Sequence, residues 1–531
     1  MNEVVFSPPS TRQGVNAGAV LAHAARFRGA AAAVIDGEVR FDYATLERRV
    51  AGLGGGLRAM GLIDGDVVAV LALNSYRHLE CWLGIPRVGL VLNELNTRLA
   101  AAEIAFVLDD CETRALVVDD AFLEVGRELL ATCPSVRHLV HASDTPATDA
   151  IDYESLVDQP AAAVAETRSD DLAGIFYTGG TTGRPKGVML THGNLIANAK
   201  AILIGLRYTG DDRYLHAGPM FHLADGASTF AVTWVGGAHV FVPSFAPAPV
   251  AATIEAERIT TSVLVPTMIN MLANDPATPG HDLSSLRCIF YGGSPMPAAV
   301  LSRALEVVGC EMVQLYGMTE AAPAATLCRI EGPITDEPWA TRLRSAGVPF
   351  VGVEVTVRRE DGSIAAVDEV GEVWLRGPNI MAGYWRRPEE TAAALTDDGW
   401  YRSGDAAKVD ADGYLYIVDR LKDMIISGGE NVYCAEVESA LSTHPAVLEV
   451  AVFGVPDERW GEAVHAAVVL REPGLATDQD LLEHCREQIA GYKVPRSFEL
   501  LDEPLPKSGA GKILKRELRE PHWRNRSVAI S

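Results

Sequence analysis

Between about residues 170 and 320, one local pattern recurs along the chain. A short apolar run is followed by a glycine- or proline-containing loop and then by a helical pattern, as at residues 174–177, 262–265 and 288–291. Such alternation is typical of an α/β fold, in which helices connect and cover the strands of a sheet. Ligands bind these sheets at the carboxyl ends of the strands. We therefore expect an α/β fold whose functional residues follow the apolar runs.

The rest of the chain predicts further structural units. At 531 residues it exceeds what one hydrophobic core usually organises, so we expect two or more domains and a hinge. From about residue 347 to 419 the pattern changes to strands and turns, with hairpin signals at Asp361-Gly362 and Asp412-Gly413. Beyond it, helices from about Cys434 and at 478–489 flank apolar strands at 447–455 and 463–470, which indicates a compact α+β unit.

These patterns together predict the domain organisation. We expect a large N-terminal domain of α/β subdomains at residues 1–420, which includes a β-rich subdomain at about 347–419. A small, mobile α+β C-terminal domain is expected at residues 421–531. The glycines 54–56 lie inside a helical pattern with no strand ahead of them, so we interpret them as helix-packing positions and not as a dinucleotide-binding fingerprint.

Composition excludes several classes of protein. The formal net charge of -24 argues against nucleic-acid binding and requires a local cationic site for any polyanionic ligand. No apolar stretch is long enough to cross a bilayer, and the first ten residues do not resemble a secretory signal. Eight scattered cysteines without a CxxC pair are typical of a reducing compartment. We expect a cytoplasmic protein without an integral membrane segment.

The segment Tyr177-Thr178-Gly179-Gly180-Thr181-Thr182-Gly183-Arg184-Pro185-Lys186-Gly187 is the strongest local signal. Small residues allow backbone N–H groups to approach phosphate oxygens, the threonine hydroxyls add donors, and Lys186 supplies positive charge. We predict phosphate binding by Thr178, Gly179, Gly180, Thr181, Thr182, Gly183 and Lys186 in preference to an ordinary flexible turn. The segment is not a Walker A loop, because Arg184-Pro185 separates Gly183 from the lysine.

Further motifs follow this loop in a fixed order. They are Pro219-Met220-Phe221-His222, Tyr291-Gly292-Gly293-Ser294-Pro295, Tyr316-Gly317-Met318-Thr319-Glu320, Tyr401-Arg402-Ser403-Gly404-Asp405, Asp419-Arg420-Leu421-Lys422-Asp423, Ser427-Gly428-Gly429-Glu430-Asn431 and Pro506-Lys507-Ser508-Gly509-Ala510-Gly511-Lys512. From about Phe41 to Leu514, the chain thereby resembles the adenylate-forming superfamily, which includes acyl-CoA synthetases of the fatty-acid or aryl-acid type, carrier-loading adenylation domains and beetle luciferases.

The resemblance implies a two-step reaction that uses ATP, Mg²⁺ and coenzyme A. A carboxylate attacks the α-phosphorus of ATP, pyrophosphate leaves, and a thiol then cleaves the acyl-adenylate. Lysine and magnesium would offset the repulsion between the two anions. In the family, the residue matching Lys512 bridges carboxylate and α-phosphate, Glu320 holds the metal, Thr319 contacts phosphate and His222 lines the acyl pocket. Without the resemblance, Lys512 would be interpreted as a solvated surface lysine. For His222, a buried core histidine is an alternative to a contact with the acyl group.

The remaining assignments also follow from the resemblance. Asp405 and Arg420 would bind the ribose and phosphate edge, Tyr316 would offer its ring to adenine, and the backbone of Gly292, Gly293, Ser294 and Gly317 would meet the nucleotide. As isolated residues, Asp405 and Arg420 would be a hairpin aspartate and half of a surface ion pair. Lys422 is the expected hinge between the domains, which would alternate between the two half-reactions. Ser427, Gly428, Gly429 and Glu430 would line the path of the thiol.

Several alternatives remain open at the level of sequence. The leading hypothesis is a cytoplasmic acyl-CoA ligase that acts on a small-molecule carboxylic acid. The alternatives are an enzyme that loads a carrier-protein thiol, an enzyme that performs one half-reaction with a partner enzyme, and a nucleotide sensor without turnover. A homodimer and a carrier protein are further candidate partners. Gly226, Gly236, Gly237 and Gly317 would leave room for a bulky acid if they line the acyl pocket, or serve only as turn glycines.

Overall fold

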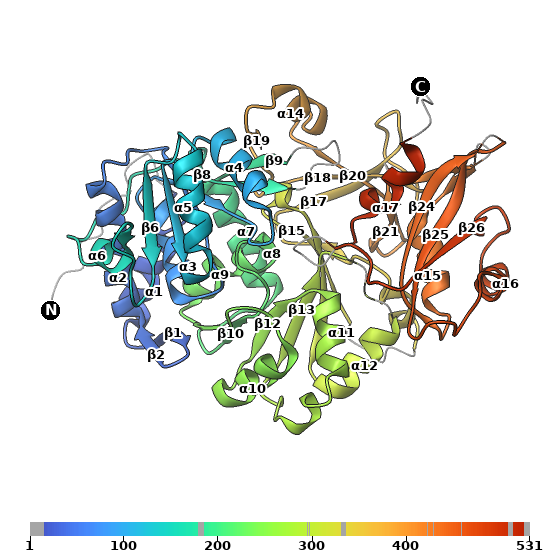
Figure 1. The fold of residues 1–531 in the computed structure, drawn as a ribbon, viewed down its shortest axis with the longest axis horizontal. Coiled ribbons are helices and arrows are strands. Elements are labelled where there is room, and N and C mark those ends of the chain that lie inside the picture. Colours follow the sequence, from blue (N-terminus) through green and yellow to red (C-terminus); the bar gives the residue numbers. More distant parts are fainter. Residues whose placement is uncertain are drawn as a thin grey trace.

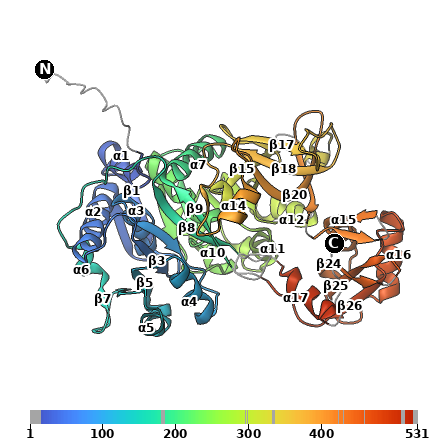
Figure 2. The same cartoon turned by 90° about the horizontal axis from the view of Figure 1, so that it is seen from above.

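The computed structural model describes residues 15–178, 185–294, 296, 298–330, 336–421, 423–427, 430–457, 459–507 and 513–524. Within these residues the elements run along the long axis of the molecule, from α1 and α2 at one end to α16 and β26 at the other (Figure 1). The view from above shows the same separation of the N-terminal and C-terminal elements (Figure 2). None of the described helices has both the length and the apolar character that a membrane crossing requires.

The first α/β sheet has the strand order β19-β9-β8-β4-β3-β5-β6-β7. Its strands are β3 (Val67–Leu71), β4 (Val91–Glu94), β5 (Ala115–Asp119), β6 (His138–Ala142), β7 (Ile151–Asp152), β8 (Leu172–Thr178), β9 (Lys186–Thr191) and β19 (Gly383–Tyr384). Pairs from β7 to β8 are parallel, and β9 and β19 extend the sheet in antiparallel fashion.

The second α/β sheet has the order β16-β15-β14-β13-β12-β10-β11-β1-β2. Its strands are β1 (Ala32–Asp36), β2 (Val39–Asp42), β10 (Arg213–His216), β11 (Ala238–Phe241), β12 (Thr261–Leu264), β13 (Cys288–Gly292), β14 (Glu311–Gly317), β15 (Ala324–Arg329) and β16 (Val348–Pro349). The strands between β1 and β14 pair in parallel, as the alternating sequence predicts.

Helices cover both faces of these sheets (Figure 1). They are α1 (Ala19–Arg28), α2 (Tyr43–Ala59), α3 (Tyr76–Arg87), α4 (Ala101–Asp110), α5 (Leu123–Thr132), α6 (Tyr153–Val157), α7 (His192–Gly205), α8 (Leu223–Gly226), α9 (Ser228–Val235), α10 (Pro247–Glu257), α11 (Pro266–Asn274) and α12 (Ala298–Val308). Val68 and Val70 of β3 face the core shared by the two sheets, whereas Ala69 and Leu71 face α4 and α5. Burial on both faces explains why these strands are apolar without interruption.

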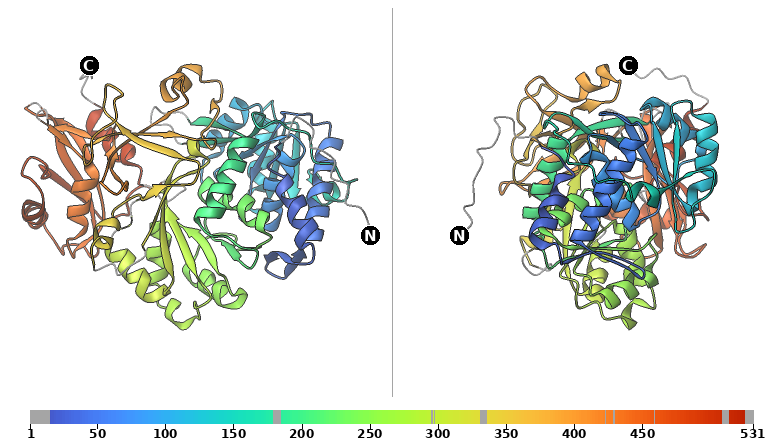
Figure 3. Two further views of the ribbon diagram at one scale, coloured as in Figure 1. Left: turned by 180° about the vertical axis from the view of Figure 1, so that it is seen from behind. Right: turned by 90° about the vertical axis from the view of Figure 1, so that its left-hand side faces the viewer.

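The β-rich region and the C-terminal region each form a smaller sheet. The β-rich sheet contains β17 (Glu354–Arg358), β18 (Gly371–Arg376), β20 (Tyr401–Val409) and β21 (Leu415–Arg420), with α13 (Trp339–Arg342) and α14 (Pro388–Ala394) beside it in sequence. The C-terminal sheet contains β22 (Ile425–Ser427), β23 (Glu430–Val432), β24 (Val447–Asp457), β25 (Gly461–Leu470) and β26 (Ser497–Leu501). Helices α15 (Cys434–Ser442), α16 (Asp478–Gln488) and α17 (Lys515–Trp523) complete it. Seen from behind, the C-terminal sheet lies at the end of the molecule opposite α1 (Figure 3).

Most of the predicted elements are confirmed, and one connection differs. β8, β12 and β13 occupy the predicted apolar runs, and Asp412-Gly413 lies in the hairpin between β20 and β21. The loop after β8, however, leads to the antiparallel strand β9 and not to a helix. Residues 186–191 form a strand with two buried pairs, 187–188 and 190–191, and with Thr178 opposite Lys186, so α7 begins only at His192. The phosphate-loop signal therefore stands between two strands, without a helix N-terminus behind it.

The glycine run in α2 is a packing device, as predicted. A Cβ at Gly52 would lie 1.9 Å from the carbonyl oxygen of Val157, and one at Gly55 would lie 2.0 Å from that of Pro160. Contacts this short are impossible for a side chain, so only glycine allows the end of α6 and the segment after it to approach the backbone of α2.

Candidate active site

Two of the sequence motifs meet where β13 and β14 end. These neighbouring strands are parallel, and Gly292 pairs with Leu315, so residues 292–294 and 316–319 emerge at the same edge of the sheet. A Cβ at Gly292 would lie 2.4 Å from the carbonyl oxygen of Leu315, and Gly293 has a φ of +82°, a conformation that favours glycine. The two motifs therefore form one surface at the carboxyl ends of the strands, where α/β sheets bind ligands.

A second cluster joins this edge to the β-rich sheet. The Tyr316 hydroxyl donates to Oδ2 of Asp405 at 2.7 Å, and Nε of Arg420 lies 3.4 Å from Oδ1 of the same carboxylate. Asp405 and Arg420 are opposite each other on β20 and β21. Burial and the neighbouring Asp405 raise the pKa of Tyr316, which keeps its hydroxyl a donor. The arrangement holds Asp405, which is buried, in a fixed orientation with lone pairs left over for further donors.

Glu320 forms the centre of a third cluster. It lies in the short 3₁₀ helix η3 (Thr319–Ala321), and the Tyr384 hydroxyl donates to its Oε1 at 2.9 Å. The ammonium group of Lys186 lies 5.2 Å from the centre of the Tyr384 ring, a cation–π distance. Backbone pairing of β19 with β9, and a hydrogen bond from Met381 N to Glu320 O at 2.9 Å, bring these segments together. Burial raises the pKa of Glu320, so its ionised form is costly without a cation nearby.

This third cluster fits a magnesium ion. Mg²⁺ prefers carboxylate oxygens together with phosphate oxygens and water, and Glu320 offers a carboxylate oriented through one oxygen by Tyr384. A bound cation would also relieve the cost of ionising a buried acid. Thr319, which begins η3, lies next to it. An oriented carboxylate of this kind is compatible with a magnesium ion that takes its other ligands from phosphate and water.

Sequence reasoning did not single out Tyr384. It lies 64 residues from Glu320, and the flanking segment 383–385 carries no charged pair or recognisable spacing. The signal that could have identified it is the edge strand β19, whose two residues pair with β9 beside the phosphate loop. Only the sheet register brings the phenol to the carboxylate.

His222 lies at the start of α8 and is half-buried. Its carbonyl oxygen accepts hydrogen bonds from Asp225 N at 3.0 Å and Gly226 N at 2.9 Å, which fixes the backbone of the turn. The side chain of Asn74 holds the same segment, because it accepts from Met220 N at 2.9 Å and donates to Gly218 O at 2.8 Å. The motif around His222 is therefore anchored to the end of β3 in the other sheet.

The glycines considered for an acyl pocket are packing or turn positions: Gly226, Gly236, Gly237 and Gly317. A Cβ at Gly317 would lie 1.9 Å from the carbonyl oxygen of Pro323, and one at Gly226 would lie 2.3 Å from the Trp82 ring. Gly236 ends α9 with a φ of +75°, and a Cβ at Gly237 would lie 3.0 Å from Asp212 O. A larger residue at Gly317 would therefore disrupt the pairing of β14 with β15 before it could fill any pocket.

Some predicted residues lie outside the described part of the chain. They are Gly179, Gly180, Thr181, Thr182, Gly183, Lys422, Gly428, Gly429 and Lys512. The residues that flank them are placed: Thr178 pairs with Lys186, Ser427 pairs with Glu430, and Lys507 pairs with Ile513. On the N-terminal side of Lys422, Leu421 N donates to Gly404 O at 2.9 Å.

Two family models and several known proteins match this chain. The model of the "AMP-binding enzyme" family matches residues 21–385, and that of the "AMP-binding enzyme C-terminal domain" matches residues 436–512. A feruloyl-CoA synthase of an Amycolatopsis species is 42% identical over 497 residues, which cover 93% of this chain and 96% of the relative. A long-chain-fatty-acid–CoA ligase of Thermus thermophilus is 36% identical, with 92% and 91% covered.

A solved structure is similar over nearly the whole chain. The anthranilate CoA ligase AuaEII, in complex with anthranoyl-AMP, has a TM-score of 0.86 and 27% identity, and the match covers 96% of this chain and 97% of that one. The likeness confirms the expected fold class, an α/β protein with a large N-terminal and a small C-terminal domain.

Proposed function

The chain belongs to the AMP-binding enzyme family, and from its similarity to a feruloyl-CoA synthase we propose that its substrate is an aryl-propenoic acid of the ferulate type. The reaction is that of an AMP-forming acyl-CoA ligase: the carboxylate and ATP give an acyl-adenylate and pyrophosphate, and the thiol of coenzyme A then gives the thioester and AMP. The aryl acid is favoured over a long-chain fatty acid because the feruloyl-CoA synthase is 42% identical and the fatty-acid ligase 36%.

The observation that carries the proposed adenylation is that the clusters around Asp405 and Glu320 are close enough beyond the end of β14 for their charges to interact. Tyr316 orients Asp405, which we assign to the ribose hydroxyls of ATP, and Arg420 is assigned to the adjoining phosphate edge. Lys186 and the hydroxyl of Thr178, paired across β8 and β9, are assigned to the phosphates together with the loop between them. Cationic and hydroxyl donors are needed there because carboxylate and triphosphate repel each other.

Glu320 is the proposed ligand of Mg²⁺, and Tyr384 positions its carboxylate. When bound, the ion supplies positive charge that stabilises the departing pyrophosphate. Thr319 is assigned a hydrogen bond to phosphate, and the backbone of Gly292, Gly293, Ser294 and Gly317 is assigned to the nucleotide edge. His222 is assigned to the acyl pocket as a contact and not as a base.

The C-terminal assignments rest on the motif match. We assign Lys512 to the adenylation step, Lys422 to the hinge, and Ser427, Gly428, Gly429 and Glu430 to the path of the thiol. We propose a domain boundary between residues 420 and 421. Rotation of the C-terminal domain there would replace Lys512 in the active site by residues 427–430 after adenylation. The proposed compartment is the cytoplasm, which accords with eight cysteines that are all buried and unpaired.

A panel of acids tests the proposal. Pyrophosphate release and thioester formation are measured with ferulate, anthranilate, 2-succinylbenzoate and a long-chain fatty acid, each with coenzyme A, with a carrier protein, or with no acceptor. We expect ferulate and coenzyme A to give the highest kcat/KM. A preference for the fatty acid would refute the aryl substrate, and acylation of the carrier protein alone would establish the alternative acceptor.

Variants in the same assay separate the site from general damage. Asp405→Asn should lower pyrophosphate release, whereas Asp410→Asn, in the hairpin turn between β20 and β21, should not. Equal effects of both changes would contradict the assignment of Asp405 to the nucleotide. Light scattering on the same sample tests the expected homodimer.

A further inference from the structure

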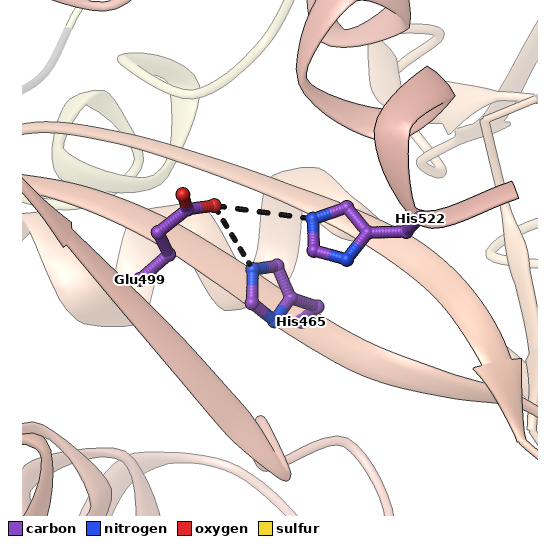
Figure 4. A group of neighbouring side chains, drawn as sticks. All are labelled: His465, Glu499 and His522. Carbon is purple, nitrogen blue, oxygen red and sulfur yellow. Dashed lines mark ion pairs between the residues drawn. The ribbon is translucent and has the colours of Figure 1, made fainter. Parts of the chain in front are cut away.

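Two histidines and a glutamate meet on one face of the C-terminal sheet: His465, Glu499 and His522 (Figure 4). His465 lies on β25 and Glu499 on β26, and these strands are parallel with His465 opposite Ser497 and Ala467 opposite Glu499. Because side chains alternate along a strand, His465 and Glu499 share a face. His522 comes from the last turn of α17, which packs on that face through Leu518.

The polar atoms of the three side chains converge on one point. Nε2 of His465 lies 3.8 Å from Oε2 of Glu499, and Nε2 of His522 lies 3.9 Å from the same oxygen. All three atoms lie within 4.8 Å of one another. Ligand atoms around a tetrahedral zinc ion, with bonds of about 2.0–2.1 Å, are about 3.3 Å apart. Zinc binding would therefore shorten the two nitrogen–oxygen distances by roughly 0.5 Å, and the separation of the two nitrogens, which is at most 4.8 Å, by at most about 1.5 Å. The exposed Glu499 and His522 side chains can make these movements.

His465 itself is prepared as a ligand. Its side chain is only 7% exposed, and among the described residues its Nε2 is a buried nitrogen with no hydrogen-bond partner. The other nitrogen, Nδ1, lies 2.7 Å from the hydroxyl of Ser497. With the Ser497 hydroxyl as acceptor, Nδ1 carries the proton and the lone pair lies on Nε2, the arrangement by which proteins orient metal-binding histidines.

The three side chains lie in a partly aromatic environment. The ring centroids of His465 and His522 are 4.9 Å apart, and both rings also lie against Phe453. Nε2 of His465 is buried without a described hydrogen bond, so it loses the hydration it has in the unfolded chain. A bound metal ion would compensate for that loss.

We propose that His465, Glu499 and His522 bind a divalent transition-metal ion, of which zinc is the preferred example, with water completing the coordination. Two imidazoles and a carboxylate are ligands that zinc accepts. The site ties the end of α17 to β25 and β26, in addition to the hydrogen bond from Trp523 Nε1 to Gly454 O at 3.0 Å. It is separate from the proposed magnesium ligand Glu320, which lies in the N-terminal domain.

Zinc binding to the metal-free, full-length protein under reducing conditions tests this site. Calorimetry with a competing chelator should give one tight zinc ion per chain, and cobalt should give the visible bands of a low-coordinate site. His465→Gln and Glu499→Gln should each weaken zinc binding by at least about a hundredfold, since even changes to the residues that orient a ligand cost about 10–100-fold. Zinc should raise the Tm of the wild type and not that of His465→Gln.

Two further variants distinguish a metal site from a simple histidine–carboxylate cluster. Ser497→Ala removes the positioning hydroxyl and should weaken zinc binding by about 10–100-fold without removing a ligand. His444→Gln is the matched control, because His444 and His484 also have rings 5.0 Å apart in the C-terminal domain but form no group with a carboxylate of the metal-site type among the described residues. The proposal would be overturned if the wild-type protein did not bind zinc tightly, or if the ligand variants bound zinc as the wild type does. Because Glu499 is exposed, Glu499→Gln keeps the test valid if a histidine variant fails to fold.

Discussion

Replacement of Tyr384 by phenylalanine removes one hydroxyl from the proposed magnesium site. In the folded protein this hydroxyl donates to Oε1 of Glu320 at 2.9 Å, and burial already raises the pKa of that carboxyl group. In Tyr384→Phe, Oε1 of the ionised Glu320 loses the hydrogen bond from the tyrosine hydroxyl. We therefore expect Tyr384→Phe to impair the step that needs an ionised, correctly oriented Glu320.

The size of the effect follows from this contact. A hydrogen bond to a charged group contributes about 1.5–3 kcal/mol, and about 1.4 kcal/mol corresponds to a factor of ten. If all of that energy is felt in adenylation, kcat/KM for ATP should fall by about ten- to 150-fold. The cation–π contact of Lys186 with the ring remains in the variant, because phenylalanine keeps the aromatic face.

The assay compares the two half-reactions. Pyrophosphate release is measured against ATP and Mg²⁺ concentration, and thioester formation is measured from chemically synthesised acyl-adenylate. Tyr416→Phe is the matched control, because Tyr416 also donates to a carboxylate, Asp410 Oδ2, at 3.0 Å, but in the β20–β21 hairpin. An adenylation rate for Tyr384→Phe within twofold of the control, or an equal loss in both half-reactions, would refute the reasoning.

Four further outcomes are expected. Lys512→Ala should reduce pyrophosphate exchange by about a hundred- to a thousandfold and leave thioester formation from supplied adenylate near the wild-type rate. Lys422→Pro should lower thioester formation far more than adenylation in pre-steady-state assays, since proline restricts the hinge backbone. Gly317→Ala should lower the free energy of unfolding by about 1–3 kcal/mol, whereas Gly280→Ala, with no atom within 4 Å of the added Cβ, should have little effect in the same denaturation assay. Burial lowers the pKa of His192 to about 4 in the folded protein, so as pH falls this histidine is protonated in the unfolded chain before it is protonated in the folded one. The free energy of unfolding should therefore drop between about pH 6.5 and 4. In urea titrations, His192→Gln should remove about 2–3 kcal/mol of that drop.

The sequence alone determined the features that depend on neighbouring residues. Apolar runs followed by glycine or proline located β8, β12 and β13, and the glycines of α2 were identified as packing positions because periodicity placed them inside a helix. The order of the motifs identified the family, and the alternation of apolar runs with loops predicted that functional residues follow the strands, as residues 293–294 follow β13.

Only the tertiary structure decided which distant side chains meet. Tyr316 and Asp405 are 89 residues apart, and Tyr384 and Glu320 are 64 apart, so both contacts depend on sheet pairings that join separate regions of the chain. The same is true of His465, Glu499 and His522, which come from two strands and a helix. Local patterns report which residues face a core, but strand register and helix docking fix which polar groups converge, because these are set by the packing of the whole domain.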